Sequence, residues 1–269
     1  MDKIPVSDND IVSLDHIAEG LSGLRIAFVN LFAVSLGTGD WTLVDAGTPL
    51  SADRIRRWTT SQFGDVAPRS IVLTHGHFDH VGALEDLAEQ WNVHVYAHPL
   101  ELPYVTGQKQ YPPPDPAVGG GLMALMSPLY PRGPVDVRDR AQPLPTDHSV
   151  PDLPGWRWIH TPGHTEGHVS FFRDSDRTLI VGDAFCTTKA ESLAAVATQR
   201  PELHGPPAYY TSDWDKARAS VEQLSLLRPS CVAPGHGQPM AGTHVADALS
   251  ELARNFDRVA RPHHGKYAA

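Results

Sequence analysis

Residues 74–80 read THGHFDH, which places three histidines and one aspartate within six consecutive positions. An apolar, β-prone segment, SIVLT, precedes this stretch, and residues 81–91 follow with the apolar spacing of a helix. The pattern therefore predicts a strand, a loop and a helix, with the polar cluster at the carboxyl end of the strand. Ligands of open α/β sheets gather at that end.

The spacing within this loop favours two neighbouring metal ions over one. His75 and His77 are two residues apart, so their side chains project together only from an extended or turning segment. Asp79 and His80 follow at the helix entry, where they can face a second point. Imidazole and carboxylate groups are common metal ligands in proteins.

Three further glycine-containing segments each add one candidate ligand directly after an apolar strand. They are TPGH at 161–164, VGDA at 181–184 and PGHG at 234–237. They contribute His164, Asp183 and His236. Each segment alone is a weak signal, but together and in this order they converge on one metal centre.

The remaining pattern indicates alternating strands and helices. Residues 24–47 read as a hairpin around the turn GTGD, and amphipathic helices are expected at 51–62, 213–227 and 244–259. This order favours an α/β or α+β fold with a layered sheet core, in one domain spanning residues 1–269. The proline-rich stretch at about 100–155 is expected to be an insertion, either a surface loop or a wall of the substrate pocket.

Composition excludes several classes of function. The 269 residues carry 22 Lys plus Arg against 31 Asp plus Glu, a net charge of −9, which argues against nucleic acid as a partner. We find no apolar run long enough to cross a membrane and no signal-peptide pattern at the start, so we expect a cytoplasmic protein. Two cysteines fit a reducing compartment. We expect a small-molecule substrate, and the oligomeric state stays open, a homodimer included.

With these motifs, the sequence resembles the metallo-β-lactamase superfamily of hydrolases, whose signature is an HxHxDH loop followed by a histidine, a bridging aspartate and a final histidine. The resemblance implies an αββα sandwich of two mixed sheets flanked by helices. It also implies that an early aspartate, Asp45 in LVDAG, orients a ligand histidine. The implied first metal site is His75, His77 and His164, the second is Asp79, His80 and His236, and Asp183 bridges them.

The resemblance implies two divalent metal ions, zinc in the first place, with manganese, iron or cobalt also compatible. A hydroxide bridging the two ions would attack a carbonyl, and Asp79 or a metal-bound water would pass a proton to the leaving group. The segment TPGHTEGHVSFF points to the glyoxalase-II-like and lactonase-like branches, hence to a small ester, lactone or thioester. One group of lactonases has a tyrosine where this chain has Cys186, so Tyr209 or Tyr210 is the candidate phenol.

The sequence leaves three alternative functions open. A phosphotriester or aryl-ester hydrolase would use the same pair of metal ions. A persulfide dioxygenase would keep the same loop but bind one iron through two histidines and an aspartate. A non-catalytic, metal-stabilised binding protein would be expected to lack a ligand, and none is missing here.

Overall fold

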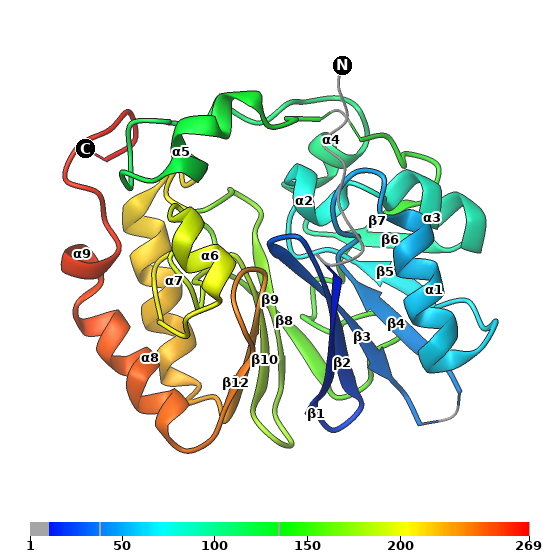
Figure 1. Cartoon of the computed structure of the whole chain (residues 1–269). Helices are drawn as coiled ribbons and strands as arrows, with labels where there is room; N and C mark the ends of the chain where they lie inside the picture. Colours follow the sequence, from blue (N-terminus) through cyan, green and yellow to red (C-terminus); the bar gives the residue numbers. More distant parts are fainter. Residues whose placement is uncertain (1–10, 38, 134, 269) are drawn as a thin grey trace.

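A computed structural model describes residues 11–37, 39–133 and 135–268 of the chain. Two β-sheets pack face to face, and helices cover the outer face of each (Figure 1). Both sheets contain parallel and antiparallel pairs. The expected αββα sandwich of two mixed sheets is thus confirmed.

The first sheet has seven strands that lie in sequence order. The first four strands are antiparallel neighbours and the last four are parallel neighbours. The strands are β1 (Ile11–Ala18), β2 (Leu21–Ile26), β3 (Val29–Ser35), β4 (Trp41–Val44), β5 (Ser70–Val72), β6 (His94–Ala97) and β7 (Ala141–Pro143).

The second sheet has five strands in the order β12-β11-β10-β9-β8. Only the β10–β11 pair is parallel among these neighbours. The strands are β8 (Trp156–His160), β9 (Val169–Arg173), β10 (Thr178–Gly182), β11 (Cys231–Pro234) and β12 (Met240–Ala241).

Helices α1 (Ala52–Phe63) and α3 (Leu84–Trp91) cover the first sheet, and α7 (Trp214–Leu226) and α8 (His244–Arg254) cover the second (Figure 1). Apolar side chains recur along one face of each of these helices, which explains their docking. The shorter helices are α2 (Phe78–Val81), α4 (Leu102–Val105), α5 (Leu122–Met126), the 3₁₀ turn η2 (Ser127–Leu129), α6 (Leu193–Thr198) and α9 (Phe256–Val259).

Three apolar layers hold the sandwich together. Ile55 of α1 and Leu84 of α3 are buried against the first sheet. Phe32 and Phe171 are buried between the two sheets. Val221 of α7 belongs to the layer on the far side of the second sheet. Burial of this apolar area is the main driving force of folding.

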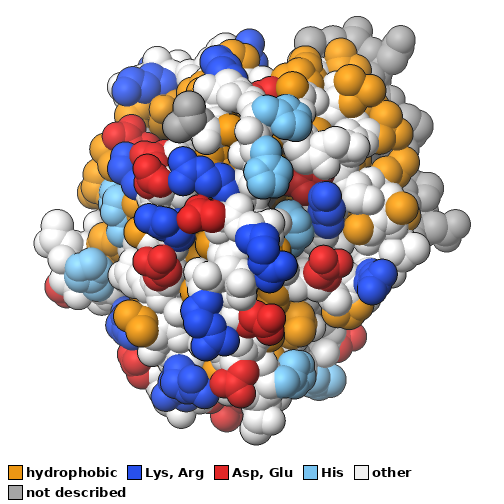
Figure 2. Space-filling view, turned by 90° about the vertical axis from the view of Figure 1, so that its left-hand side faces the viewer, with side chains coloured by type: hydrophobic (Ala, Val, Ile, Leu, Met, Phe, Trp, Pro, Cys, Tyr) orange, Lys and Arg blue, Asp and Glu red, His pale blue; other side chains and the backbone are white. Residues whose placement is uncertain are grey.

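The outer face of the second helical layer is polar. Figure 2 shows Lys and Arg side chains interspersed with Asp and Glu on this face. The pairs include Arg218 with Asp257 at 3.1 Å and Arg228 with Asp247 at 3.1 Å. Such exposed pairs contribute at most about 1 kcal/mol each, so this face is a solvated surface more than a source of stability.

Two segments differ in detail from the expectation. The first arm of the hairpin expected at 24–47 is divided between two strands, because Ala27 adopts a left-handed backbone (φ 57°) and turns the chain between β2 and β3. The stretch 100–155 is not structureless, since it contains α4, α5, η2 and the edge strand β7. None of the helices that the structure describes is both long enough and apolar enough to cross a membrane.

Candidate metal centre

All seven predicted ligand residues meet at one end of the sandwich. The HGHFDH loop follows β5 and enters α2, and the His164 loop joins β8 to β9. Asp183 directly follows β10, and His236 lies just after β11. All seven side chains are buried, with at most 6% of any residue exposed. The sheet ends therefore gather residues from four distant parts of the sequence.

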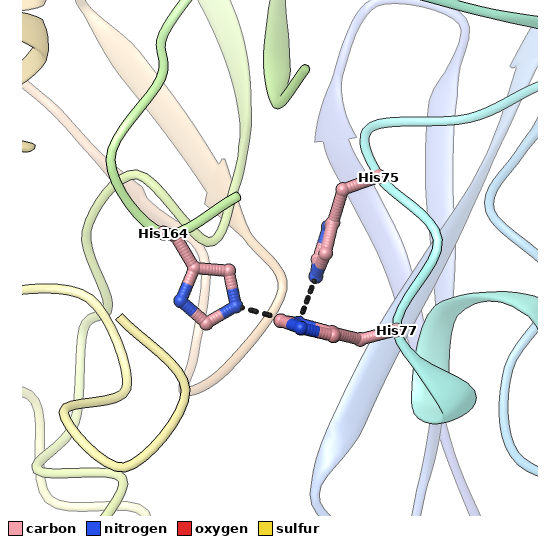
Figure 3. A group of neighbouring side chains, drawn as sticks. All are labelled: His75, His77 and His164. Atoms are coloured by element: carbon pink, nitrogen blue, oxygen red, sulfur yellow. Dashed lines mark hydrogen bonds between the residues drawn. The ribbon is translucent and has the colours of Figure 1, made fainter. Parts of the chain in front are cut away.

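The first three histidines point their ring nitrogens at one another (Figure 3). Nε2 of His75 lies 3.0 Å from Nδ1 of His77, which lies 2.9 Å from Nε2 of His164. Burial lowers the pKa of all three rings, that of His164 to about 4. Neutral imidazoles with converging lone pairs are the form that a metal ion requires.

A second group lies beside the first and shares a carboxylate with it. Asp79, His80 and His236 bring their ligand atoms within 4.8 Å of one another. The carboxylate of Asp183 lies between the groups. Its Oδ2 is 3.1 Å from His236 Nε2 and 3.5 Å from His164 Nε2, and its Oδ1 is 3.4 Å from His80 Nε2. This is the position of a bridging ligand.

Charges in this second group are strongly coupled. Burial by itself would lower the pKa of His80, but the carboxylates of Asp183 and Asp45 outweigh burial and raise it. Burial would likewise raise the pKa of Asp183, but His236 and His80 hold it well below its ordinary value. The histidines thus keep the buried carboxylate of Asp183 ionised, which is the form in which a carboxylate can bind a metal ion.

The arrangement fits a pair of divalent ions. Two facing atoms, Nε2 of His80 and Oδ1 of Asp183, are buried 3.4 Å apart, and neither makes a well-formed hydrogen bond among the described residues. Buried polar atoms rarely stay unpaired unless an ion or water satisfies them. A tetrahedral zinc site with Zn–N distances of about 2.0–2.1 Å spaces its nitrogens about 3.4 Å apart, close to the spacing of the first histidine group.

Neighbouring groups fix which nitrogen faces the centre in four of the five candidate ligand histidines. The hydroxyl of Thr74 donates to Asp45 at 2.8 Å and lies 3.1 Å from Nδ1 of His75, so it accepts the Nδ1 proton of that ring. In the same way Thr211 donates to a backbone carbonyl and lies 3.2 Å from Nδ1 of His164. Both histidines therefore keep the Nε2 lone pair free for a metal ion.

The two histidines of the second group are oriented in the same way, through contacts at their Nδ1 atoms. Nδ1 of His80 lies 2.8 Å from Oδ2 of Asp45, and Nδ1 of His236 lies 2.8 Å from the carbonyl oxygen of Phe28. Asp45 thus contacts one of the proposed ligand histidines, and it holds a left-handed backbone (φ 63°) that aspartate tolerates. Gly235 must lack a Cβ, because one there would collide with Asp183 and His80.

Glu101 is a buried residue beside the candidate centre that the sequence did not indicate. Its carboxylate is fully buried and accepts hydrogen bonds from the backbone N–H of Gly76 at 2.9 Å and of Gly167 at 3.0 Å. The hydroxyls of Thr165, at 2.7 Å, and of Tyr111 donate to it as well. Glu101 thus ties the HGH loop to the His164 loop.

His168 was missed for a different reason. Its Nε2 accepts a hydrogen bond from the backbone N–H of Asp183 at 2.8 Å, and its Nδ1 lies 2.8 Å from the hydroxyl of Thr161. His168 thus positions Asp183, but its own ring nitrogens do not face the candidate metal centre. The only available signal was its position four residues after His164.

The two predicted tyrosines occupy different places. The ring of Tyr210 lies 4.6 Å from that of His77, and its hydroxyl is buried without a partner in the described part of the chain. Burial raises its pKa, so the phenol stays protonated. Tyr209 belongs to the apolar layer beneath and contacts Tyr130 and Tyr210.

Comparison with known proteins supports the assignment of the family. The family model of the metallo-beta-lactamase superfamily matches residues 24–236. The chain belongs to this superfamily. A probable metallo-hydrolase of Bacillus subtilis, YflN, is 45% identical over 245 residues, which cover 90% of this chain and 93% of that protein. The resemblance drawn from the motifs is thus confirmed.

Solved structures agree with this fold. A metallo-beta-lactamase from Erythrobacter litoralis, with beta-mercaptoethanol in its active site, is 18% identical and has a TM-score of 0.60 over 93% of this chain and 99% of its own. TTHA1623, solved in a di-iron-bound form, is 27% identical, with a TM-score of 0.54 over 84% of this chain and 92% of its own. Because the Erythrobacter litoralis protein is only 18% identical to this chain, its likeness shows the fold alone.

Proposed function

We propose that this chain is a metal-dependent hydrolase that holds two divalent ions and cleaves small esters, lactones or thioesters. One observation carries the proposal: four ligand histidines have their Nδ1 atoms occupied by Asp45, Thr74, Thr211 and the Phe28 carbonyl. Their Nε2 atoms are thereby free, and Asp183 lies between them.

In this proposal His75, His77 and His164 hold one ion, Asp79, His80 and His236 hold the other, and Asp183 bridges them. The ions would lower the pKa of water toward neutrality and polarise an acyl carbonyl. We favour zinc for this set of nitrogen and oxygen donors, and a relative with two irons makes iron the alternative.

The chain itself contributes orientation and proton transfer. Asp79, whose Oδ2 lies 3.5 Å from Nε2 of His236, is proposed to pass a proton to the leaving group. The buried phenol of Tyr210 is proposed to donate a hydrogen bond to the oxygen of the substrate carbonyl. Its neutral hydroxyl lacks another acceptor among the residues that the structure describes. Tyr209 is the second candidate for this role.

The place of action is also a proposal. Both cysteines, Cys186 and Cys231, are buried and free. Free thiols are ordinary in a reducing cytoplasm, which is where we propose that the protein acts on its small-molecule substrate.

The test is a hydrolysis panel with protein freed of metal and then reloaded with two equivalents of zinc. The panel contains p-nitrophenyl acetate, a γ- or δ-lactone, an acyl thioester and a phosphotriester. We expect turnover of the acyl substrates that depends on the metal and is lost in Asp183→Ala. Turnover of the phosphotriester alone, or none with both sites filled, would reject the proposal.

A further inference from the structure

We infer that the pocket beside His77 and His164 accepts a short, uncharged acyl chain, and that Tyr267 limits the length of that chain. This inference rests on the proposed function and adds a substrate class to it. It concerns residues 261–268 and the proline-rich insertion, neither of which holds a predicted metal ligand.

The pocket opens directly onto the first histidine group. His77 and His164 form part of its lining, so a carbonyl bound at the centre extends its acyl chain into this space. The cavity measures about 120 Å³, whereas pockets for drug-sized ligands are about 300–1,000 Å³. Its walls are mostly aromatic rings and prolines, namely Tyr104, Tyr111, Pro112, Pro113, Tyr210 and Tyr267.

The charge of the lining favours an uncharged chain. Glu166 is a lining residue, and none of the described lining residues is a lysine or an arginine. The ammonium group of Lys266 lies over the ring of Tyr267, 4.8 Å from its centroid, and Lys266 is not part of the lining. A carboxylate on the acyl chain would therefore lose its hydration without gaining a cationic partner in the pocket wall.

The wall of rings is rigid on the side of the insertion. Tyr104 and Tyr111 stack with centroids 3.9 Å apart, and the ring of Tyr111 lies 4.4 Å from that of His77. The hydroxyl of Tyr111 also donates to the buried carboxylate of Glu101. These rings cannot withdraw without disturbing the loop that holds the ligand histidines.

Tyr267 also forms part of the pocket wall, but it belongs to the segment 261–268 and not to the insertion. Its hydroxyl donates to the carbonyl of Pro113 at 3.2 Å, and the backbone N–H of Lys266 donates to the carboxylate of Asp115. Arg261 ties the start of this segment to Asp215 at 2.8 Å. Figure 1 shows the red segment lying beside the green insertion at the edge of the sandwich. Tyr267 is thus a positioned wall of the pocket.

The test compares p-nitrophenyl esters from acetate to octanoate with the full chain loaded with zinc. We expect kcat/KM to be highest for the acetate-to-butyrate range. In Tyr267→Ala we expect the octanoate ester to gain at least about tenfold relative to acetate, because each methylene that enters an apolar pocket is worth about tenfold or more. An unchanged ranking would overturn the role of Tyr267.

Two control variants separate the ring from its surroundings. Tyr267→Phe keeps the ring and removes the bond to Pro113, so the wild-type ranking should persist. His264→Ala alters an exposed residue of the same segment and should also keep the ranking. A shift toward octanoate in His264→Ala equal to that in Tyr267→Ala would show a general loosening of the segment and overturn the inference.

The effect of charge on the acyl chain of the substrate is tested with two esters of similar length, p-nitrophenyl butyrate and p-nitrophenyl hemisuccinate. We expect kcat/KM to be higher for the butyrate ester than for the hemisuccinate ester. In Glu166→Gln we expect the ratio of the two kcat/KM values to be smaller. Equal or faster cleavage of hemisuccinate would overturn the uncharged class. Calorimetry measures the binding of the two matching primary amides in the absence of turnover. We expect the affinities of the amides to rank in the same order as the esters. Loss of ester cleavage with the amide ranking intact would therefore count against the proposed function alone.

Discussion

Oδ2 of Asp45 lies 2.8 Å from Nδ1 of His80, and the other oxygen of the same carboxylate accepts the backbone N–H of Thr74 at 2.8 Å. Asp45 follows β4, whereas Thr74 and His80 follow its neighbour β5. One buried carboxylate therefore fixes both the start of the HGHFDH loop and the tautomer of His80, a proposed metal ligand. Partners of this kind commonly matter for metal affinity as much as the ligands do.

Asp45→Asn is expected to weaken zinc binding about 10- to 100-fold, because an amide cannot accept hydrogen bonds with both of its polar atoms. Competition with a chromophoric chelator measures this affinity. Asp174→Asn, which changes an exposed residue paired with Arg157, is the matched control. Equal zinc affinity in Asp45→Asn and the control would rule out the orienting role.

Asp183→Ala is expected to reduce metal content and turnover together. This substitution removes the only side chain that approaches His80, His164 and His236 at once among the described contacts. Mass spectrometry of the metals and an ester assay on the same sample test the expectation, and a thermal melt verifies that the variant is folded. Full activity in this variant would contradict the two-ion mechanism.

Glu101→Gln is expected to destabilise the fold by about 2–4 kcal/mol, because the amide turns an acceptor into a donor that faces other donors in a buried place. For a chain of this size the melting temperature should fall by several degrees, roughly 2–4 °C per kcal/mol. Glu89→Gln alters an exposed glutamate and serves as control. A melting temperature equal to that of the control would show that Glu101 does not join the two loops.

Tyr210→Phe is expected to lower kcat for ester cleavage about 100- to 1,000-fold without changing metal content, since one donor to a developing oxyanion contributes on that scale. The melting temperature should not fall, because the hydroxyl has no partner to lose among the described residues. Tyr209→Phe is the matched variant. If Tyr209→Phe alone lowers kcat, the phenol has been assigned to the wrong tyrosine.

The fold was predicted correctly from the sequence, and the structure brings the seven proposed ligand residues together, because both depend on local patterns. His75, His77, Asp79 and His80 lie within one loop, and the other three ligands each stand beside a glycine at a strand end. Strand ends of one sandwich meet at a common edge, so the motifs could be combined without coordinates.

Residues that act through long-range contacts could not be predicted in this way. Glu101 lies in a proline-rich stretch without a recognisable motif, and its partners are up to 66 residues away in the chain. Tyr267 meets Pro113 across 154 residues, so nothing near it in the sequence marks it as a wall of the pocket. The turn at Ala27 depends on a left-handed residue that is not glycine, which apolar periodicity does not reveal.

Plasma mass spectrometry of protein purified without chelator counts the metal ions that each chain holds. We expect about two ions per chain, zinc or a similar divalent metal. The stoichiometry decides more than the identity of the metal, because overexpression can load whichever ion binds most tightly. A single iron per chain, with the second group empty after zinc is added, would contradict the two-ion hydrolase and favour a mononuclear dioxygenase.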